Sequence, residues 1–264
     1  MPSVENPYLL QISTLLAGVF PHIPANPMLA RIVSPEDFDY HRKQSRLTLP
    51  DLAETEHAVL RSFKLPKRRA QWLTGRLCAK EAIIGYCRKY LPHIQPPPRN
   101  TLHIRNTSTG RPELRENHLP AELQLLDISI SHSGVYAAAL VSGSLCGIDI
   151  QERSDTLERV RDRFCSLEEG YMLNVHIPGL DNLGRLSMLW AAKEALKKTL
   201  SSDGMPGFLD FMLTGINVVE DAGFVMYFRQ NNRPSLMRVP LQVAVTFFDG
   251  YALAVCLTRV ESNA

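Results

Sequence analysis

The sequence predicts an α+β fold made of two similar halves, and three observations support this prediction. The stretch "CAKEAI" at 78–83 resembles "AAKEAL" at 191–196, and both consist of good helix formers. Each is followed by two alternating apolar stretches around a glycine turn, "DISISHSGVYAAALVSG" and "LQVAVTFFDGYALAVCLT". The separation along the chain from Lys80 to Gly134 is close to that from Lys193 to Gly250. A helix followed by an antiparallel hairpin therefore occurs twice, and we expect one half in residues 1–142 and the other in residues 143–264.

Composition and charge describe an ordinary globular protein. The chain has 264 residues, of which 45% are hydrophobic and 21% charged, enough to bury a core in each half. Its formal net charge of +2 is too small to indicate a nucleic-acid partner.

The cysteines and the N-terminus indicate a cellular compartment. The five cysteines are scattered and form no CxxC pair, which argues against a disulfide framework or a zinc site and favours a reducing cytoplasm. The apolar run at 8–20 is preceded by Glu5 and by no lysine or arginine, and it is too short to span a bilayer. We expect neither a signal peptide nor a membrane association.

In the first half, the basic stretch "KRRAQWLTGRLCAKEAI" at 67–83 predicts a helix, and the hairpin after it is expected to turn at Ser133-Gly134. The second half opens with "CGIDIQ", a strand in which Asp149 stands between two isoleucines. A buried acid in a strand is costly unless it lies at an edge or binds something. Asp149 is therefore either a ligand-binding residue or a cap for the next helix.

Two helices follow Asp149. Ser166 with Glu169 three residues later has the pattern of a capping box, which predicts a helix start. The stretch "LWAAKEALKK" at 189–198 predicts a second helix, in which Trp190, Glu194 and Lys197/Lys198 share or adjoin one face. By itself this second pattern is that of a solvated amphipathic helix.

Taken together, these motifs resemble those of the Sfp-type 4′-phosphopantetheinyl transferases. That family has a G-[IV]-D strand, an F-x-S-x-x-E helix start and W-x-x-K-E-x-x-x-K, and all three occur here in this order. The upstream G-[KR]-P and S-H-S-G elements are matched by Gly110-Arg111-Pro112 and Ser131 to Gly134, so the resemblance covers roughly residues 60–256. It implies two α+β halves with the active site between them. It also implies transfer of the phosphopantetheine arm of coenzyme A to a serine of a carrier protein, with release of 3′,5′-ADP.

The resemblance assigns the metal and the leaving group. Asp149 and Glu194 would hold Mg²⁺ on the pyrophosphate of coenzyme A, and a hard cation on carboxylates suits that group. Lys198, one helical turn after Glu194, would lie beside the phosphates and stabilise or protonate the leaving group. Its neighbour Lys197 points about a hundred degrees away and is assigned to solvent.

The same resemblance assigns the nucleotide end of coenzyme A to the first half. Ser131 and His132 would contact its phosphates, with His132 at the 3′-phosphate. Arg111 would reach the adenine or a phosphate. Lys67 and the two arginines after it offer further positive charge, of which we expect one or two residues to bind.

Two details stay open. Many bacterial members carry an acid where this chain has Gln151, and an amide binds Mg²⁺ more weakly than a carboxylate. We expect a water to complete the metal shell, because Glu152 should point to the opposite face of the strand. The base that deprotonates the serine is Glu194 acting through the metal, a metal-bound water, or Glu169. Cys165 lacks an activating neighbour in the sequence, so we do not expect it to be a nucleophile.

Two other functions predict different features in the sequence. Another Mg²⁺-dependent phosphotransferase would be expected to show a Walker-type loop, and none is present in the sequence. A non-catalytic module that binds coenzyme A or a carrier protein would be expected to lack Asp149, Glu194 or Lys198. We therefore expect a monomeric cytoplasmic enzyme whose partners are coenzyme A and an apo acyl or peptidyl carrier protein. An apolar set is expected either to dock the carrier or to belong to the core: Tyr171, Met172, Leu173, Val175 and Ile177.

Overall fold

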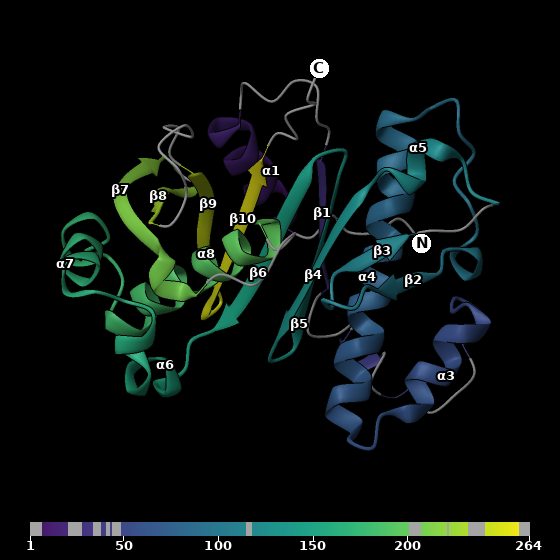
Figure 1. Ribbon diagram of the computed structural model, residues 1–264, viewed down its shortest axis with the longest axis horizontal. Helices are drawn as coiled ribbons and strands as arrows, with labels where there is room; N and C mark the ends of the chain where they lie inside the picture. The colour runs from purple at the N-terminus through teal and green to yellow at the C-terminus, as the bar shows by residue number, and fades with distance from the viewer. Residues whose placement is uncertain are drawn as a thin grey trace. The chain divides into compact units, whose positions relative to one another are not determined.

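The computed structural model of the chain combines helices with antiparallel sheets (Figure 1), which confirms the α+β class. The residues that it describes are 7–20, 28–33, 38–40, 43, 49–114, 118–200, 207–220, 222–231 and 241–258. Contacts divide the chain into unit 1, Met1–Leu9 with Ile23–Cys146, and unit 2, Leu10–His22 with Gly147–Ala264. The boundary expected after residue 142 stays a prediction. The assignment of residues 10–22 to unit 2 was not anticipated from the sequence.

Unit 1 is built around one long helix. Its helices are α3 (Glu54–Ser62), α4 (Pro66–Tyr90), the 3₁₀ turn η1 (Arg99–Thr101) and the short α5 (Ala121–Gln124). Its strands are β1 (Met28–Val33), β2 (Ile104–Asn106), β3 (Pro112–Leu114), β4 (Asp127–Ser133) and β5 (Tyr136–Ser142). The main sheet has the order β1-β5-β4, and β2 pairs with β3 in a separate antiparallel ribbon.

Helix α4 packs against the β1-β5-β4 sheet. Pro66 begins the helix, where its fixed φ and missing N–H are tolerated, and two basic residues in the last turn, Arg88 and Lys89, complement the helix dipole. At Gly75 an added Cβ would lie 3.0 Å from Ile130 Cγ2. A glycine at this position therefore lets α4 approach closely to β4, the strand that carries Ser131 and His132.

Unit 2 holds a larger sheet, with the order β6-β10-β9-β8-β7. Its strands are β6 (Leu145–Glu152), which begins at the boundary, β7 (Phe211–Val219), β8 (Gly223–Gln230), β9 (Leu241–Phe248) and β10 (Tyr251–Thr258). Its helices are α6 (Asp155–Arg159), α7 (Leu167–His176) and α8 (Asn182–Leu200), the 3₁₀ turns η2 (Arg161–Arg163) and η3 (Phe208–Asp210), and most of α1 (Pro7–Val19).

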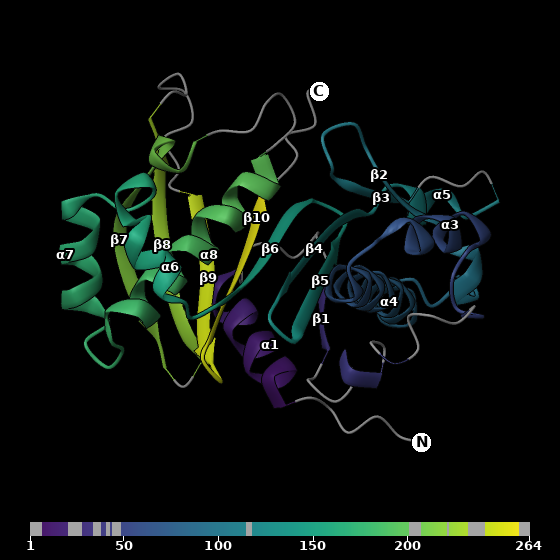
Figure 2. The ribbon, with the colours of Figure 1, turned by 90° about the horizontal axis from the view of Figure 1, so that it is seen from below.

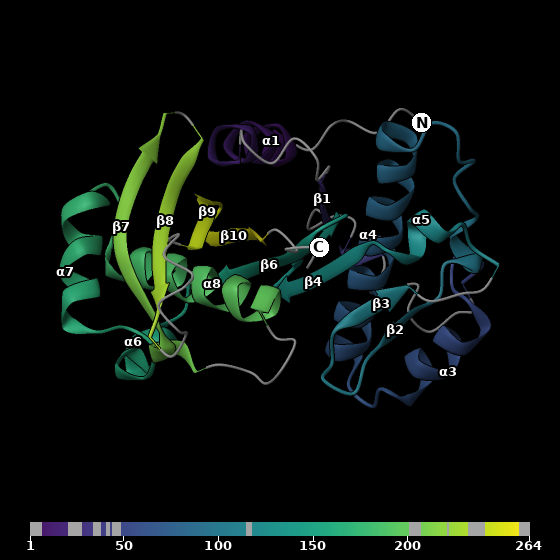
Figure 3. The ribbon, with the colours of Figure 1, turned by 45° about the horizontal axis from the view of Figure 1, so that its top comes forward.

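Helices α8 and α1 lie on opposite faces of this sheet, as Figure 2 and Figure 3 show. The side chains of Leu189 and Leu196 in α8 are fully buried in one core with Phe211 and Val243 of the sheet. On the other face, Gly18 of α1 lies so close to β7 that an added Cβ would be 3.3 Å from Val219 Cγ1. Among the described residues, no helix combines the length and apolar character needed to cross a membrane.

Both predicted hairpins are confirmed, with one shift. In the first, Ser133 pairs with Tyr136, so the turn residues are Gly134 and Val135 rather than Ser133 and Gly134. Gly134 has a φ of 54°, which glycine adopts without strain.

The second hairpin turns at the predicted Asp249-Gly250, where φ is 47° and 76°. Two positive φ values match the twist of the flanking strands, which is why an Asp-Gly pair favours this turn. Each unit thus has a long helix packed on a hairpin and on one further strand, in the orders β1-β5-β4 and β6-β10-β9.

Candidate active site

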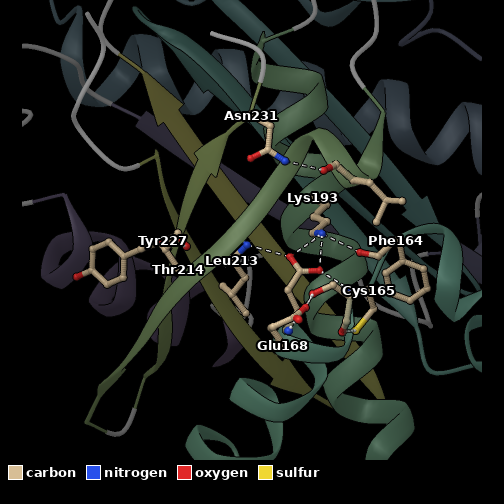
Figure 4. Close-up of polar contacts among 11 residues, drawn as sticks. Phe164, Cys165, Glu168, Lys193, Leu213, Thr214, Tyr227 and Asn231 are labelled. Atoms are coloured by element: carbon tan, nitrogen blue, oxygen red, sulfur yellow. Dashed lines mark hydrogen bonds and ion pairs between the residues drawn. The ribbon is translucent and has the colours of Figure 1, made fainter. Parts of the chain in front are cut away.

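A buried ion pair fixes the centre of α8. Lys193 Nζ lies 2.7 Å from Glu169 Oε1, and both side chains are almost fully buried. The same ammonium donates to the carbonyl oxygen of Phe164 at 2.7 Å (Figure 4). Burial lowers the pKa of Lys193, and the charge of Glu169 opposes that effect.

Glu169 is committed to further contacts. Its carboxylate accepts the backbone N–H of Ser166 at 2.9 Å, while Ser166 Oγ accepts the N–H of Glu169, so the predicted capping box is confirmed. The carboxylate also accepts the N–H of Leu213 in β7 at 2.9 Å, a contact drawn in Figure 4. This one side chain therefore joins α7, α8 and the sheet of unit 2.

Unit 1 contains the same arrangement. Lys80 and Glu56 form a fully buried ion pair, 24 residues apart along the chain, and Lys193 and Glu169 are also 24 apart. Lys80 Nζ donates to Asp51 O at 2.9 Å, and Glu56 accepts the N–H of Ala53, three residues before it, at 2.9 Å. The lysine of the K-E motif is therefore a structural element of the repeated unit. In both units a glutamate follows this lysine, Glu81 in unit 1 and Glu194 in unit 2.

Strand β6 brings Asp149 to the end of α8. Lys198 Nζ lies 2.8 Å from Asp149 Oδ1 and donates to Ile148 O at 2.9 Å. The Asp149 side chain is 9% exposed and that of Lys198 is 28% exposed, so the pair is reachable from solvent at the lysine. Asp149 of β6 and Lys198 of α8 are therefore in direct contact through their side chains.

Gly147 explains how the strand and helix come so close. An added Cβ at this position would lie 2.1 Å from Ala195 O and 2.4 Å from Thr199 Oγ1. Any side chain would push α8 away from β6, because the first of these atoms belongs to the helix backbone. The glycine of the G-I-D motif is therefore a spacing requirement for the Asp149–Lys198 pair.

Glu194 lies one turn before Lys198 and has a different partner. Its Oε1 is 3.0 Å from Lys197 Nζ, and the Lys197 side chain is only 12% exposed. The ammonium also lies 4.0 Å from the ring centroid of Phe208, which packs on Trp190 at 4.4 Å. The assignment of Lys197 to solvent was therefore wrong, because Phe208, which follows the end of α8, folds over it.

The third predicted metal position is occupied by a polar side chain with its own bond. Gln151 Nε2 donates to Glu152 O at 2.7 Å, and Glu152 is exposed. Within the described ranges, no group of three or more His, Cys, Asp or Glu side chains is arranged to hold a metal ion. A metal here would therefore have to rely on fewer protein ligands and on its substrate.

The residues predicted for the nucleotide end lie in unit 1. On β4, Ser131 is buried and pairs in register with Ala138, while the next residue, His132, is half-buried. Lys67 is exposed in the first turn of α4. Of the three side chains, Lys67 is therefore the most open to solvent and Ser131 the least.

Arg111 makes a specific contact with another side chain of unit 1. Its Nε lies 3.0 Å from Asp127 Oδ1, its Nη2 pairs with the second carboxylate oxygen, and Nη2 also donates to Cys146 O at 3.2 Å. Such a two-point pair between arginine and a carboxylate is a strong, oriented contact. Arg111 thereby fastens the segment before β3 to the start of β4.

Sequence reasoning missed one candidate, Arg76. It lines a cavity of about 500 Å³ in unit 1, together with Thr55, Trp72, His103, Arg105 and Asn106. Arg76 is 6% exposed, stacks over the ring of Trp72 and donates to Asn106 Oδ1 at 2.6 Å, yet its Nε has no hydrogen-bond partner. In the sequence, Arg76 lies within the basic stretch at 67–83, directly after Gly75.

Cys165 directly precedes Ser166, the N-cap of α7. Its side chain is buried and burial raises the pKa of the thiol, so the reactive thiolate is disfavoured.

Known proteins similar to this chain fall in one family. The family model described as 4′-phosphopantetheinyl transferase superfamily matches residues 145–256, the range that contains β6, α7 and α8. Enterobactin synthase component D of Escherichia coli O157:H7 is 30% identical over 177 residues, which is 66% of this chain and 72% of that protein. The protein of the same name from Shigella flexneri matches equally. This chain belongs to the 4′-phosphopantetheinyl transferase superfamily.

As a member of this superfamily, the chain is an enzyme that transfers 4′-phosphopantetheine from coenzyme A to a carrier protein. Among solved structures, apo-ACPS of Chronobacterium ammoniagenes is 23% identical with a TM-score of 0.36, covering 44% of this chain and 96% of that one. Its complex with coenzyme A has the same identity and a TM-score of 0.35, and covers 44% of this chain and 95% of that one. The G-I-D, F-C-S-L-E-E and W-A-A-K-E-A-L-K-K motifs of this phosphopantetheinyl transferase all fall within the matched range.

Proposed function

We propose that this phosphopantetheinyl transferase is Mg²⁺-dependent, that Asp149 and Glu194 are the metal ligands, and that Lys198 binds the departing phosphate. The observation that supports this most directly is the contact between Lys198 Nζ and Asp149 Oδ1 at 2.8 Å. It joins the acid of β6 to the end of α8, one turn beyond Glu194. The acceptor is a serine hydroxyl of the carrier, and the other product is 3′,5′-ADP.

The donor set fits magnesium. Mg²⁺ is commonly bound by one or two carboxylates together with substrate phosphates and waters, so a larger cluster of protein ligands is not required. Asp149 and Glu194 supply two carboxylates, and the amide nitrogen of Gln151 is already engaged with Glu152 O. When bound, the metal would neutralise charge on the pyrophosphate. We propose that a water, rather than Gln151, takes the remaining protein-side position.

Lys198 can exchange one anion for another. Its ammonium is bound to Asp149 and to Ile148 O, and its side chain is more exposed than that of Lys197. A phosphate oxygen placed at this ammonium would gain a charge-assisted hydrogen bond as negative charge develops on the leaving group. Stabilising that charge is the contribution that we assign to Lys198.

Glu169 is proposed to have a structural role instead of that of the general base. Its carboxylate is buried and accepts hydrogen bonds from Lys193, Ser166 and Leu213. A base must reach the proton that it removes, and these contacts leave Glu169 no access to a substrate. We assign the removal of the serine proton to Glu194 or to a water beside it.

The nucleotide end of coenzyme A is proposed to bind in unit 1. Ser131 and His132 on β4 and Lys67 on α4 keep their proposed roles as phosphate contacts. We add Arg76, because a buried guanidinium with an unpartnered N–H in a cavity of about 500 Å³ favours an anion there. Arg111 is proposed to contact the nucleotide while Asp127 holds its guanidinium in place.

The carrier is proposed to dock on α7. Leu167, Tyr171 and Val175 are 82%, 71% and 52% exposed, and their spacing of four residues puts them on one helix face. Leu173 and Ile177 are buried and belong to the core of unit 2, so they leave the docking set. The docking surface is therefore narrower than the sequence suggested and begins at the capped end of the helix.

The cellular setting is proposed to be the cytoplasm and the enzyme to be a monomer. All five cysteines are unbonded and buried, which fits a reducing compartment. Size-exclusion chromatography with light scattering tests the second part, and a mass near 29.7 kDa is expected for one chain.

One experiment tests the proposed function. The protein is incubated with coenzyme A and a panel of apo carrier proteins of the fatty-acid, polyketide and non-ribosomal peptide types, with Mg²⁺ or with a chelator. Intact mass then reports attachment of the phosphopantetheine arm. We expect the mass gain on at least one carrier with Mg²⁺ and its loss with the chelator. Transfer that is unaffected by the chelator would contradict the metal dependence.

A further inference from the structure

The two carboxylates proposed as metal ligands are each held by one of two adjacent lysines. Asp149 is paired with Lys198, and Glu194 is paired with Lys197 at 3.0 Å. The lysines differ in their surroundings, because Lys198 is the more exposed and Lys197 lies under an aromatic ring. The first belongs to the catalytic machinery proposed above. The second has no role in it.

We propose that Lys197 is a positioning residue that acts as the counter-ion of Glu194 before a metal binds. In this role it holds the carboxylate in place and competes with a divalent cation for it. The inference rests on the proposed assignment of Glu194 as a metal ligand. It adds a residue that sets how much Mg²⁺ the enzyme requires.

The position of Lys197 makes the competition effective. Its ammonium lies 3.0 Å from Glu194 Oε1 in a setting where its side chain is only 12% exposed. Solvent screens a pair of this kind less than it screens a pair on the open surface. A cation that binds Glu194 must therefore displace a positive charge that is already in place, and the ammonium then repels it.

Phe208 gives the displaced ammonium an alternative partner. The ring of Phe208 in η3 lies 4.0 Å from Lys197 Nζ, at cation–π distance, and the ring itself packs on Trp190. Lys197 can therefore leave the carboxylate without losing all of its favourable contacts. The ammonium can therefore order Glu194 in the absence of metal and still yield the carboxylate when Mg²⁺ binds.

The test measures Mg²⁺ binding directly, by calorimetry on the metal-free full chain without coenzyme A. Lys197→Met removes the charge while keeping a long side chain, and we expect its Kd for Mg²⁺ to fall by about fivefold, the factor that a partly buried ion pair of this type can contribute. Lys197→Arg keeps a cation and should bind Mg²⁺ like the parent. Lys89→Met is the matched control, because Lys89 lies 4.9 Å from the ring of Tyr90 in unit 1 and its loss changes the net charge equally.

Thermal unfolding supplies a second readout. Without metal, Lys197→Met should melt below the parent, because Glu194 has lost its counter-ion. Saturating Mg²⁺ should remove that difference, since the metal replaces the counter-ion in the variant. In transfer assays on Lys197→Met, the Mg²⁺ concentration that gives the half-maximal rate should fall together with the Kd. The rate at saturating Mg²⁺ should change by a smaller factor than this concentration does.

The outcomes separate this inference from the one on which it rests. A Kd for Mg²⁺ that is unchanged or weaker in Lys197→Met overturns the counter-ion role, while Glu194 stays a ligand if Glu194→Gln loses binding. The same tightening in Lys89→Met overturns it too, because net charge alone would then explain the effect. If Glu194→Gln binds Mg²⁺ like the parent, the ligand assignment fails and the counter-ion role fails with it.

Discussion

The ammonium of Lys198 lies 2.8 Å from Oδ1 of Asp149, although 49 residues separate the two along the chain. Strand β6 and helix α8 meet at this point because Gly147 lets the helix backbone approach. An acid that the sequence left between two interpretations, metal ligand or helix cap, is thus placed beside the lysine of the W-x-x-K-E-x-x-x-K motif. The first two predictions test this pair and its neighbour on α8.

Replacing Lys198 should slow the chemical step. Lys198→Met removes the ammonium that we assign to the leaving phosphate, and such a contact is worth about a hundredfold or more in rate. Single-turnover transfer at saturating coenzyme A and Mg²⁺ measures it. Lys197→Met serves as the comparison, because at saturating Mg²⁺ its effect should be much smaller. Equal losses for the two adjacent lysines would contradict the assignment.

Removing either carboxylate charge should abolish transfer through the metal. Asp149→Asn and Glu194→Gln keep the shape of the side chains and remove an anionic ligand, so Mg²⁺ binding should weaken markedly while the circular dichroism spectrum is retained. Calorimetric titration with Mg²⁺ and single-turnover transfer are the measurements. Gln151→Ala is the control, because its amide nitrogen is bonded to Glu152 O and a water is expected in the metal shell. Normal Mg²⁺ binding in either variant would show that the replaced residue is not a metal ligand.

The buried pair of unit 2 should matter for folding. Glu169→Gln leaves the ammonium of Lys193 buried without an opposite charge, and breaking such a pair costs about 3–5 kcal/mol in the free energy of unfolding. Urea denaturation measures it. The neighbouring Glu168, which is exposed, offers a matched control in Glu168→Gln, whose effect should be far smaller. Glu56→Gln, the corresponding change in unit 1, should destabilise like Glu169→Gln.

Arg76 should affect the binding of coenzyme A more than turnover. Arg76→Leu removes the buried guanidinium from the cavity in unit 1, and we expect the KM for coenzyme A to rise about tenfold, as for the loss of one charged hydrogen bond. The rate at saturating coenzyme A should change little. Arg99→Leu, at an exposed pair with Glu81 and outside that cavity, is the control and should leave the KM for coenzyme A unchanged. A normal KM in Arg76→Leu would remove Arg76 from the nucleotide site.

Buried thiols should make the protein less stable at alkaline pH. Burial raises the pKa of Cys256 from an ordinary 9.0 to about 12, so above pH 9 the unfolded chain loses this proton and the folded chain keeps it. Because the folded state then binds more protons, the free energy of unfolding falls as the pH rises from 9 towards 12. The contribution between pH 9 and pH 10 is roughly 1 kcal/mol. Comparing urea unfolding of the parent and Cys256→Ala at pH 8, 9 and 10 should show a shallower decline in the variant, and parallel curves would contradict it.

Local patterns in the sequence predicted local structure well. The capping box of Ser166 and Glu169, the Asp249-Gly250 turn and the duplicated helix-hairpin order all depend on residues close together in the chain, and the structure contains them. The side-chain contacts of Glu169 illustrate the limit. The capping box was readable, but its ion pair with Lys193 and its bond to the Leu213 N–H depend on long-range packing.

Lys197 and Arg76 were misjudged or missed for the same reason. Helix geometry turns Lys197 about a hundred degrees from Lys198, but it gives no hint that Phe208, eleven residues on, covers it. Arg76 appeared to be one more charge on a basic helix, with Trp72 one turn before it on the same helix. Its burial and its hydrogen bond to Asn106 depend on tertiary packing. A helical wheel reports which residues share a face. What covers that face depends on the rest of the chain.

The close approach at Gly147 also bears on how distant relatives of this chain can be recognised. A methyl group there would overlap a helix carbonyl oxygen, so a sequence with alanine at this position needs a wider gap between strand and helix. A wider gap would move the acid of the strand away from the lysine at the helix end. Alignments that score this glycine as a substitutable small residue would therefore accept chains in which the two charged groups no longer meet. Treating it as a fixed spacer would separate sequences that can build this pair from sequences that only share the fold.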